Sequence, residues 1–247
     1  MTGSILIAVG SLLNAVGIII GALAGLSGKS LSPASQSYFK TGLGAFAAFL
    51  GLRLVWDGLN GPFRQIAGQI LVALAAIILG RFAGRLLHLQ KFSNRLGQFA
   101  RLRIAAAVPG KIPPWSDGFH TCTALFCAAP LAVLGSVTDG LAGDFFPLAL
   151  KAVMDALAAM SFAAMFGAGG VAMSALPVFA WQGTLTLLCA AYAAPFLLQH
   201  HLLDAVNVVA GLQVVFVSLV IFEVRKIELA DYLPALALAP LLAWFWH

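Results

Sequence analysis

The chain has 247 residues, of which 61% are hydrophobic and 9% are charged. A soluble domain carries about a quarter charged residues, so this composition excludes an ordinary soluble protein. Apolar residues run continuously instead of alternating, which excludes a β-barrel and predicts an all-α, polytopic helical membrane protein with about eight transmembrane helices. The formal net charge is +5. Because the basic residues flank the apolar stretches, they indicate how the protein is oriented in the membrane and do not predict a nucleic-acid partner.

The apolar stretches predict one membrane domain over residues 1–247, in which successive spans are joined by short polar loops. The predicted spans are residues 5–26, 41–59, 65–87, 119–134, 145–166, 168–198, 205–222 and 233–246. Residues 27–37 and 135–144 are predicted loops, the second carrying Asp139 and Asp144. Residues 168–198 exceed the roughly twenty residues that one crossing needs. This span is therefore predicted either to tilt and protrude from the membrane or to break near residues 177–183. We expect a break in its backbone hydrogen-bond ladder between Ser174 and Gly183.

The first span carries glycines at positions 17, 21 and 25. A spacing of four places them on one stripe of a helix, where another helix can approach closely. Asn14 lies in the middle of the same span. Such a side chain forms an interhelical hydrogen bond or contacts a ligand, and both interpretations stay open.

Residues 88–111 have a different character, because leucines and phenylalanines recur at intervals of three and four with bases between them. This pattern predicts a basic amphipathic helix on the membrane surface. A regulatory or partner-binding helix is the alternative.

Most of the 14 lysines and arginines fall in or beside the loops that follow the first, third and seventh predicted spans. Bases accumulate on the cytoplasmic side of a membrane. The loop 88–111 is therefore predicted to be cytoplasmic, and residues 135–144 with Asp139 are predicted to lie outside.

The fifth predicted span contains Lys151 and Asp155. An ionisable side chain at membrane depth is costly and rare unless it faces protein, water or a substrate. Four residues apart on a helix, these two side chains lie on one face and can neutralise each other. They form a structural ion pair, or Asp155 exchanges a proton or Na⁺ while Lys151 attracts an anion.

Further polar or flexible residues lie in the apolar stretches on both sides of this span. Gly169 and Gly170 form a turn whose free N–H groups can face an anion, although a purely structural turn fits as well. The other candidate ligands for a substrate or ion are Asn14, Ser174, Gln182, Asn207 and Gln213.

The two ends of the chain resemble each other weakly. The matched positions are Gly10, Asn14, Ala15 and Gly17 with Gly170, Ser174, Ala175 and Pro177, and Gly42, Leu43 and Leu50 with Gly211, Leu212 and Leu219. The predicted units 1–87 and 168–247 would then run in opposite senses around residues 119–166, which is a common architecture of transporters. Unrelated apolar helices account for the matches equally well.

A set of small and polar residues is similar to a bacterial inner-membrane family catalogued as domain of unknown function 554 (DUF554). The residues that carry the resemblance are Gly135, Ser136, Asp139, Gly140, Gly143, Asp144, Lys151, Asp155, Gly167, Gly169, Gly170, Ser174, Gln182 and Gly183. The resemblance covers nearly the whole chain but departs at Ala128 and Ala129, where a glycine is expected. It implies a multi-pass inner-membrane protein, and some members are labelled as proposed transport proteins.

We therefore expect a small secondary transporter or channel-like carrier for a small solute or ion, coupled to protons or Na⁺ through Asp155. The alternative is a scaffold or regulatory protein that acts through residues 88–111. No nucleophile elbow, phosphate loop or zinc-protease motif is present, so we expect no enzyme, cofactor or metal site, although an intramembrane hydrolase using Asp139 and Asp155 is compatible with the sequence. The partners are the lipid bilayer and the solute; a monomer and a homo-oligomer both stay open.

Overall fold

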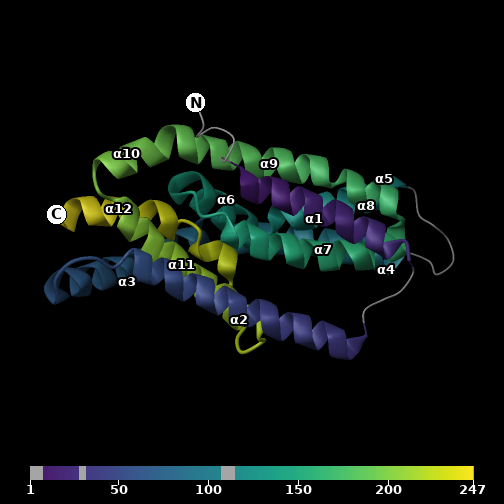
Figure 1. The fold of residues 1–247 in the computed structure, drawn as a ribbon, viewed down its shortest axis with the longest axis horizontal. Coiled ribbons are helices and arrows are strands. Elements are labelled where there is room, and N and C mark those ends of the chain that lie inside the picture. Colours follow the sequence, from purple (N-terminus) through teal and green to yellow (C-terminus); the bar gives the residue numbers. More distant parts are fainter. Residues whose placement is uncertain (1–7, 28–31, 107–114, 247) are drawn as a thin grey trace.

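The computed structural model describes residues 8–27, 32–106 and 115–246, and these residues form helices and turns without any strand (Figure 1). The α-helices are α1 (Val9–Gly25), α2 (Pro33–Asp57), α3 (Phe63–Leu86), α4 (Leu89–Ala106), α5 (Trp115–Ala128), α6 (Pro130–Ala142), α7 (Phe146–Phe166), α8 (Ala168–Met173), α9 (Ala175–Leu188), α10 (Ala194–Gln199), α11 (Leu203–Ile221) and α12 (Ala235–Trp246). A π turn, η1 (Cys189–Ala193), and a 3₁₀ turn, η2 (Leu229–Tyr232), complete the set. The all-α prediction is confirmed.

Six helical segments within these ranges are long and apolar enough to cross a membrane. They are α2, α3, α7, the segment Ala168–Gln199, α11 and the segment Leu229–Trp246. The bent pair α5–α6 adds a seventh, and α1 is a shorter apolar helix of 17 residues. The predicted number of about eight crossings is thus approximate.

The predicted loop 27–37 is wrong over its second half, because α2 begins at Pro33. Ser32 is the N-cap, and its hydroxyl accepts a hydrogen bond of 3.1 Å from the Ser35 N–H. Pro33 occupies the first helical position, where a missing N–H costs no hydrogen bond. The helix therefore begins eight residues before the predicted start at Thr41.

The fourth predicted span, residues 119–134, and the loop 135–144 up to Ala142 are also wrong. The chain forms two helices, α5 and α6, that meet at an angle of 58°. Ala129 has an extended conformation between them, and Pro130 begins α6. A residue before proline is driven out of the helical region, which ends α5 at the point where the sequence departs from the DUF554 pattern. Asp139 lies inside α6 instead of in an external loop, and 4% of its surface is exposed.

The predicted break at residues 177–183 is not observed, because α9 continues through them. Pro177 falls in the first turn of α9, where no hydrogen bond depends on its nitrogen. The helix is interrupted at Ser174, on the edge of the expected window, and again at the π turn η1. Pro195 follows η1, and a π turn accommodates its ring without a clash against the preceding turn.

The glycine stripe of the first span packs against α7, which runs parallel to α1. A Cβ on Gly17 would lie 2.8 Å from the Ala152 carbonyl oxygen, and a Cβ on Gly21 would overlap the Ala156 backbone. The same contact recurs one turn later, between Gly25 and Met160. The predicted close approach of a second helix along this stripe is confirmed.

Corresponding helices of the two terminal units pack on one another in opposite directions: α1 with α9, α2 with α11 and α3 with α12 (Figure 1). At the α2–α11 crossing, a Cβ on Gly51 would meet the Gly211 carbonyl oxygen at 2.7 Å, and a Cβ on Gly211 would meet the Gly51 carbonyl oxygen at 2.5 Å. These glycines are 160 positions apart, like Gly10 and Gly170. The arrangement supports an inverted repeat with an offset of 160 positions. The predicted match of Gly42 with Gly211 has an offset of 169 and is therefore out of register with this repeat.

Charged residues gather at two opposite ends of the bundle. At the basic end, Glu223 and Glu228 of the loop after α11 pair with bases. The bases at this end are Lys40, Arg81, Arg85, Arg225 and Lys226. At the acidic end, Arg53 pairs with Asp57 and Asp144, and Asn60 donates to Asp204. These five bases, which the sequence analysis assigned to one side of the membrane, thus lie at one end of the bundle.

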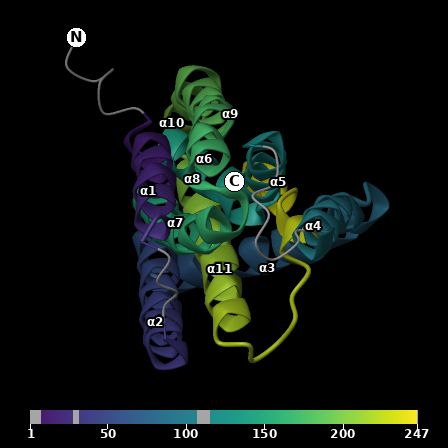
Figure 2. The ribbon, with the colours of Figure 1, turned by 90° about the vertical axis from the view of Figure 1, so that its right-hand side faces the viewer.

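The predicted amphipathic helix 88–111 corresponds to α4, whose last predicted residues, 107–111, lie outside the described ranges. It runs antiparallel to α5: Ser93 donates to the Ala128 carbonyl at 3.4 Å, and Arg103 pairs with Asp117 at 2.5 Å. Figure 2 shows α4 and α5 on the side of the molecule away from α1 and α2. That α4 lies on a membrane surface stays a prediction.

Candidate functional site

The candidate site centres on Lys151 and Asp155 of α7, which form an ion pair inside the protein. Only 1% of Lys151 and 7% of Asp155 is exposed. The Lys151 ammonium also lies 5.7 Å from the ring centroid of Phe126 on α5, which adds a cation–π contact. The two side chains share one helical face, as the spacing of four predicted.

Two amides from other helices join this pair. The Asn14 side chain of α1 donates a hydrogen bond of 3.1 Å to the Gln182 Oε1 of α9. The same amide also donates toward the Asp155 carboxylate. Both amides are fully buried. Four of the predicted site residues, Lys151, Asp155, Asn14 and Gln182, are therefore brought together by α1, α7 and α9.

Several buried polar atoms on α1, α5, α6 and α9 have no hydrogen-bond partner among the described residues. They include Asn14 Oδ1, Gln182 Nε2, Ser11 Oγ, Thr121 Oγ1, Ser136 Oγ and Asp139 Oδ2. A buried polar atom normally has a partner, and an orphaned one indicates water, an ion or a ligand. These atoms belong to α1, α5, α6 and α9, and most are oxygens that can accept a proton or contact a cation.

Asp139 is the main functional candidate that the sequence analysis misplaced. The backbone N–H of Gly10, in the first turn of α1, points at its carboxylate. Asp144 lies nearby in the turn between α6 and α7, where its carboxylate pairs with Arg53 and accepts the Phe146 N–H at 3.1 Å. The signal that could have located Asp139 is Pro130, which begins a helix that includes it.

Ser174 and Gly170 have structural roles, and no contact of Gly169 indicates one. The buried Ser174 hydroxyl donates to the Val171 carbonyl at 2.6 Å, which satisfies it within its own helix. A Cβ on Gly170 would overlap the Trp115 carbonyl, so this glycine allows α8 to pack against α5. Gly169 has open space around its Cβ position. The predicted cradle for an anion thus gains no support here.

Asn207 and Gln213 lie on α11, away from the Lys151–Asp155 pair. Gln213 donates a hydrogen bond of 2.8 Å to the Tyr232 carbonyl and thereby fastens η2 to α11. Asn207 is half-buried. The structure therefore does not bring these two residues to the site.

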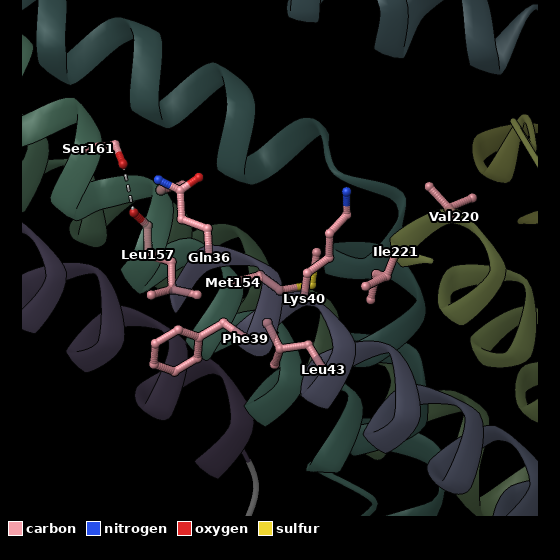
Figure 3. A pocket seen from close by; sticks show the side chains of 10 residues that line it. Gln36, Phe39, Lys40, Leu43, Met154, Leu157, Ser161, Val220 and Ile221 are labelled. Carbon is pink, nitrogen blue, oxygen red and sulfur yellow. Dashed lines mark hydrogen bonds between the residues drawn. The ribbon is translucent and has the colours of Figure 1, made fainter. Parts of the chain in front are cut away.

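One cavity in the described part of the chain is lined by α7 and another by α5, whereas a larger one, of about 690 Å³, lies elsewhere, between α6, α10 and α12. One of about 490 Å³ opens between α2, α7 and α11, and Figure 3 shows Gln36, Phe39, Lys40 and Leu43 of α2 beside the α7 side chains that line it. Met154, Leu157, Ala158 and Ser161 line its α7 wall. These residues flank Asp155 in sequence, but Asp155 itself is not part of the lining. A second cavity, of about 470 Å³, lies at the α5–α6 bend against α4, lined in part by Asn94, Gln98 and Arg101.

Long apolar helices, an inverted arrangement and a buried ion pair define an integral membrane protein of the multi-pass helical class. The family described as "Protein of unknown function (DUF554)" matches residues 9–244. The chain belongs to this family, which confirms the resemblance found in the sequence.

Two relatives are similar to this chain. It is 26% identical over 226 residues to the uncharacterized membrane protein YdfK of Bacillus subtilis (strain 168), covering 91% of this chain and 90% of the relative. It is 31% identical over 122 residues to the uncharacterized protein YqgA of Escherichia coli (strain K12), covering 49% of this chain and 51% of that protein. No solved structure matches the chain.

Proposed function

We propose that the protein is a small secondary transporter or channel-like carrier that moves a small solute or ion across the bacterial inner membrane. The observation that carries this proposal is the buried Lys151–Asp155 pair with its two amides and unpartnered oxygens. Transport is coupled to a proton or Na⁺, which binds at Asp155.

The energetic argument rests on the cost of burial. Removing two charges from water costs several kcal/mol per ion, and the attraction between them often only offsets this cost. Apolar side chains of similar volume would hold the helices equally well. Charges retained at this depth therefore favour a task that requires them, such as binding an ion and releasing it.

The inverted arrangement supports the same proposal. Transporters with inverted repeats bind substrate and coupling ion near the midplane, where the two repeats meet. Asn14 lies on the first unit and Gln182 on the second, and their hydrogen bond joins the two units. An ion at Asp155 can thus bias how the units pack on each other.

A second candidate function uses α4. Its bases Lys91, Arg95 and Arg101 are exposed, and a basic helical face can bind an acidic partner or anionic lipid. On this alternative the protein is a scaffold or regulator, and the ion pair has only a structural role.

We further propose that the basic end is cytoplasmic, because bases accumulate on that side. An impermeant thiol reagent added outside intact cells should modify a cysteine introduced at Asn60 and spare one introduced at Arg95. Asn60 is exposed at the acidic end, whereas Asp139 is buried and a cysteine there would not report on the external side. The reverse pattern would overturn this orientation.

The transport proposal is tested with purified protein in proteoliposomes. Proton movement is followed with an internal pH-sensitive dye and sodium movement with radioactive Na⁺. We expect the wild type to move one of these ions under an imposed gradient and Asp155→Asn to fall to the level of protein-free liposomes. Asp57→Asn, the same chemical change at the exposed acidic end, is the control and should retain wild-type flux.

A wild type that moves neither ion, while it folds and binds acidic lipid vesicles through α4, would favour the scaffold. Asp155→Asn protein with wild-type flux would remove Asp155 from the mechanism.

A further inference from the structure

We propose that Asp139 is a proton relay between the acidic end and Asp155, so that the coupling ion is a proton. This inference rests on the proposed function and adds a second carboxylate, a direction of access and the identity of the ion. It starts from the position of Asp139, which α6 buries against the first turn of α1.

Two opposing forces act on the Asp139 carboxyl. The Gly10 N–H and the positive end of the α1 dipole stabilise its anionic form. Burial and the nearby Asp144 carboxylate favour its neutral form instead. A carboxyl held between these forces can gain and lose a proton as its surroundings change slightly.

The surroundings of Asp139 fit a proton better than Na⁺. A hard cation needs several oxygen ligands, whereas a proton needs one free carboxylate oxygen. Oδ2 of Asp139 has no hydrogen-bond partner in the described ranges, and the Gly10 N–H on the same side is a donor that repels a cation. Leu148 also occupies this side, against Gly10.

The path inward runs along α1. Gly10 faces Asp139, and Asn14 faces Asp155 one turn further on. Between them in sequence, Ser11 is fully buried and its hydroxyl has no partner within the described chain. A hydroxyl can accept one proton while it donates another, so Ser11 has the chemistry of a relay between the two carboxylates.

The step balances without another reactant. A proton from the acidic end forms an O–H bond at Asp139 Oδ2. Because neither Asp139 Oδ2 nor the Ser11 hydroxyl has a hydrogen-bond partner in the described chain, a water must bridge them. The proton then passes through that water to the Ser11 oxygen as the hydroxyl releases its own proton, again through water, toward Asp155, which restores the hydroxyl and the Asp139 carboxylate. One proton enters and one leaves.

Other titratable groups lie on the elements that pack against α6. They are Asp117, His120, Cys122 and Cys127 on α5, Lys151 and Asp155 on α7, Cys189 and Tyr192 on η1 and Asp204 on α11. Asp144 is the charge that acts directly on Asp139, and Arg53 is its partner. Asp144 therefore forms the outer end of the path.

The test measures dye-reported proton flux in proteoliposomes under a potassium diffusion potential. Asp139→Asn should lower the flux about tenfold or more, as the loss of a proton-transfer group does. Asp139→Glu should restore part of it, and Glu223→Gln, an exposed carboxyl at the opposite end of the bundle, should match the wild type. Wild-type flux in Asp139→Asn, beside blocked Asp155→Asn, would overturn the relay and leave the proposed function intact. Sodium flux without proton flux in the wild type would do the same, whereas no flux of either ion would overturn both.

A second measurement tests the inference even if Asp139→Asn folds poorly, because it does not use that variant. Infrared spectroscopy of the wild type in lipid should show the carbonyl stretch of a protonated buried carboxyl that disappears as pH rises. The same titrating band should persist in Asp155→Asn. Its absence from both proteins at every pH would overturn the inference.

Discussion

The α1–α7 and α2–α11 interfaces use the same kind of contact but bury different side chains. In each, a glycine lets two backbones meet: Gly21 rests on Ala156, and Gly51 rests on Gly211. The α2–α11 crossing is otherwise packed with apolar side chains, whereas the α1–α7 face includes Asp155 and its partners. Small-residue packing holds helices together in lipid without charges. The comparison indicates that the ion pair is not needed to assemble the bundle.

The largest expected effect comes from unbalancing the ion pair. Asp155→Asn leaves the Lys151 ammonium buried without a counter-charge and should lower the free energy of unfolding by about 3–5 kcal/mol. Lys151→Met/Asp155→Leu removes the attraction together with the desolvation cost, so its stability should stay close to that of the wild type. Denaturant unfolding in detergent, followed by tryptophan fluorescence, measures both. An equal loss in the two proteins would show that the pair itself stabilises the fold.

Glycine replacement tests whether the two interfaces depend equally on close packing. Gly21→Leu and Gly51→Leu each force a side chain into a neighbouring backbone and should cost about 1–3 kcal/mol. Gly42→Leu on α2 is the control, because open space surrounds its Cβ position. The same unfolding assay applies. If only the Gly21 variant were destabilised, the proposed equivalence of the two crossings would fail.

A smaller effect is expected from the hydrogen bond that joins the two units. A double-mutant cycle of Asn14→Ala and Gln182→Ala should give a coupling energy of about 0.6 kcal/mol, the average for such bonds in a membrane protein. Ser174→Ala is a matched control, since its hydroxyl bonds only within its own helix. A coupling near zero would mean that Asn14 and Gln182 act independently.

The smallest effect lies at the basic end. A hydrogen bond from Lys40, together with its charge, lowers the pKa of the exposed Glu223 carboxyl. A depressed pKa stabilises the folded protein above the unfolded value of about 4.3, and this contribution is lost as pH falls through the folded value. The Tm of the wild type should therefore fall slightly more on acidification than that of Glu223→Gln. Identical pH profiles would show that this pair contributes nothing.

Much of the fold followed from the sequence, because lipid imposes helices and the apolar stretches mark them. The errors occurred where one residue decides the local backbone. Pro177 suggested a break but occupies a first helical turn, whereas Pro130 starts a helix after a real bend. A proline has opposite meanings in these two positions, and the hydrophobic pattern around it does not distinguish them.

The candidate site was predictable only where polar residues stand out in an apolar helix. Lys151, Asp155, Asn14 and Gln182 met this condition, and the structure brings them together. Asp139 did not stand out, because its helix was read as a loop. Gln213 met the condition but bonds to Tyr232 elsewhere, since sequence polarity does not reveal which helices pack on one another.

The most direct measurement of the central claim is ion flux through Lys151→Met/Asp155→Leu in proteoliposomes, with folding verified in the same sample by gel filtration and circular dichroism. We predict a folded protein whose proton and sodium fluxes equal those of protein-free liposomes, because the side chain that takes up the ion is gone. A folded double variant with wild-type flux would contradict the account and leave the pair as a structural ion pair.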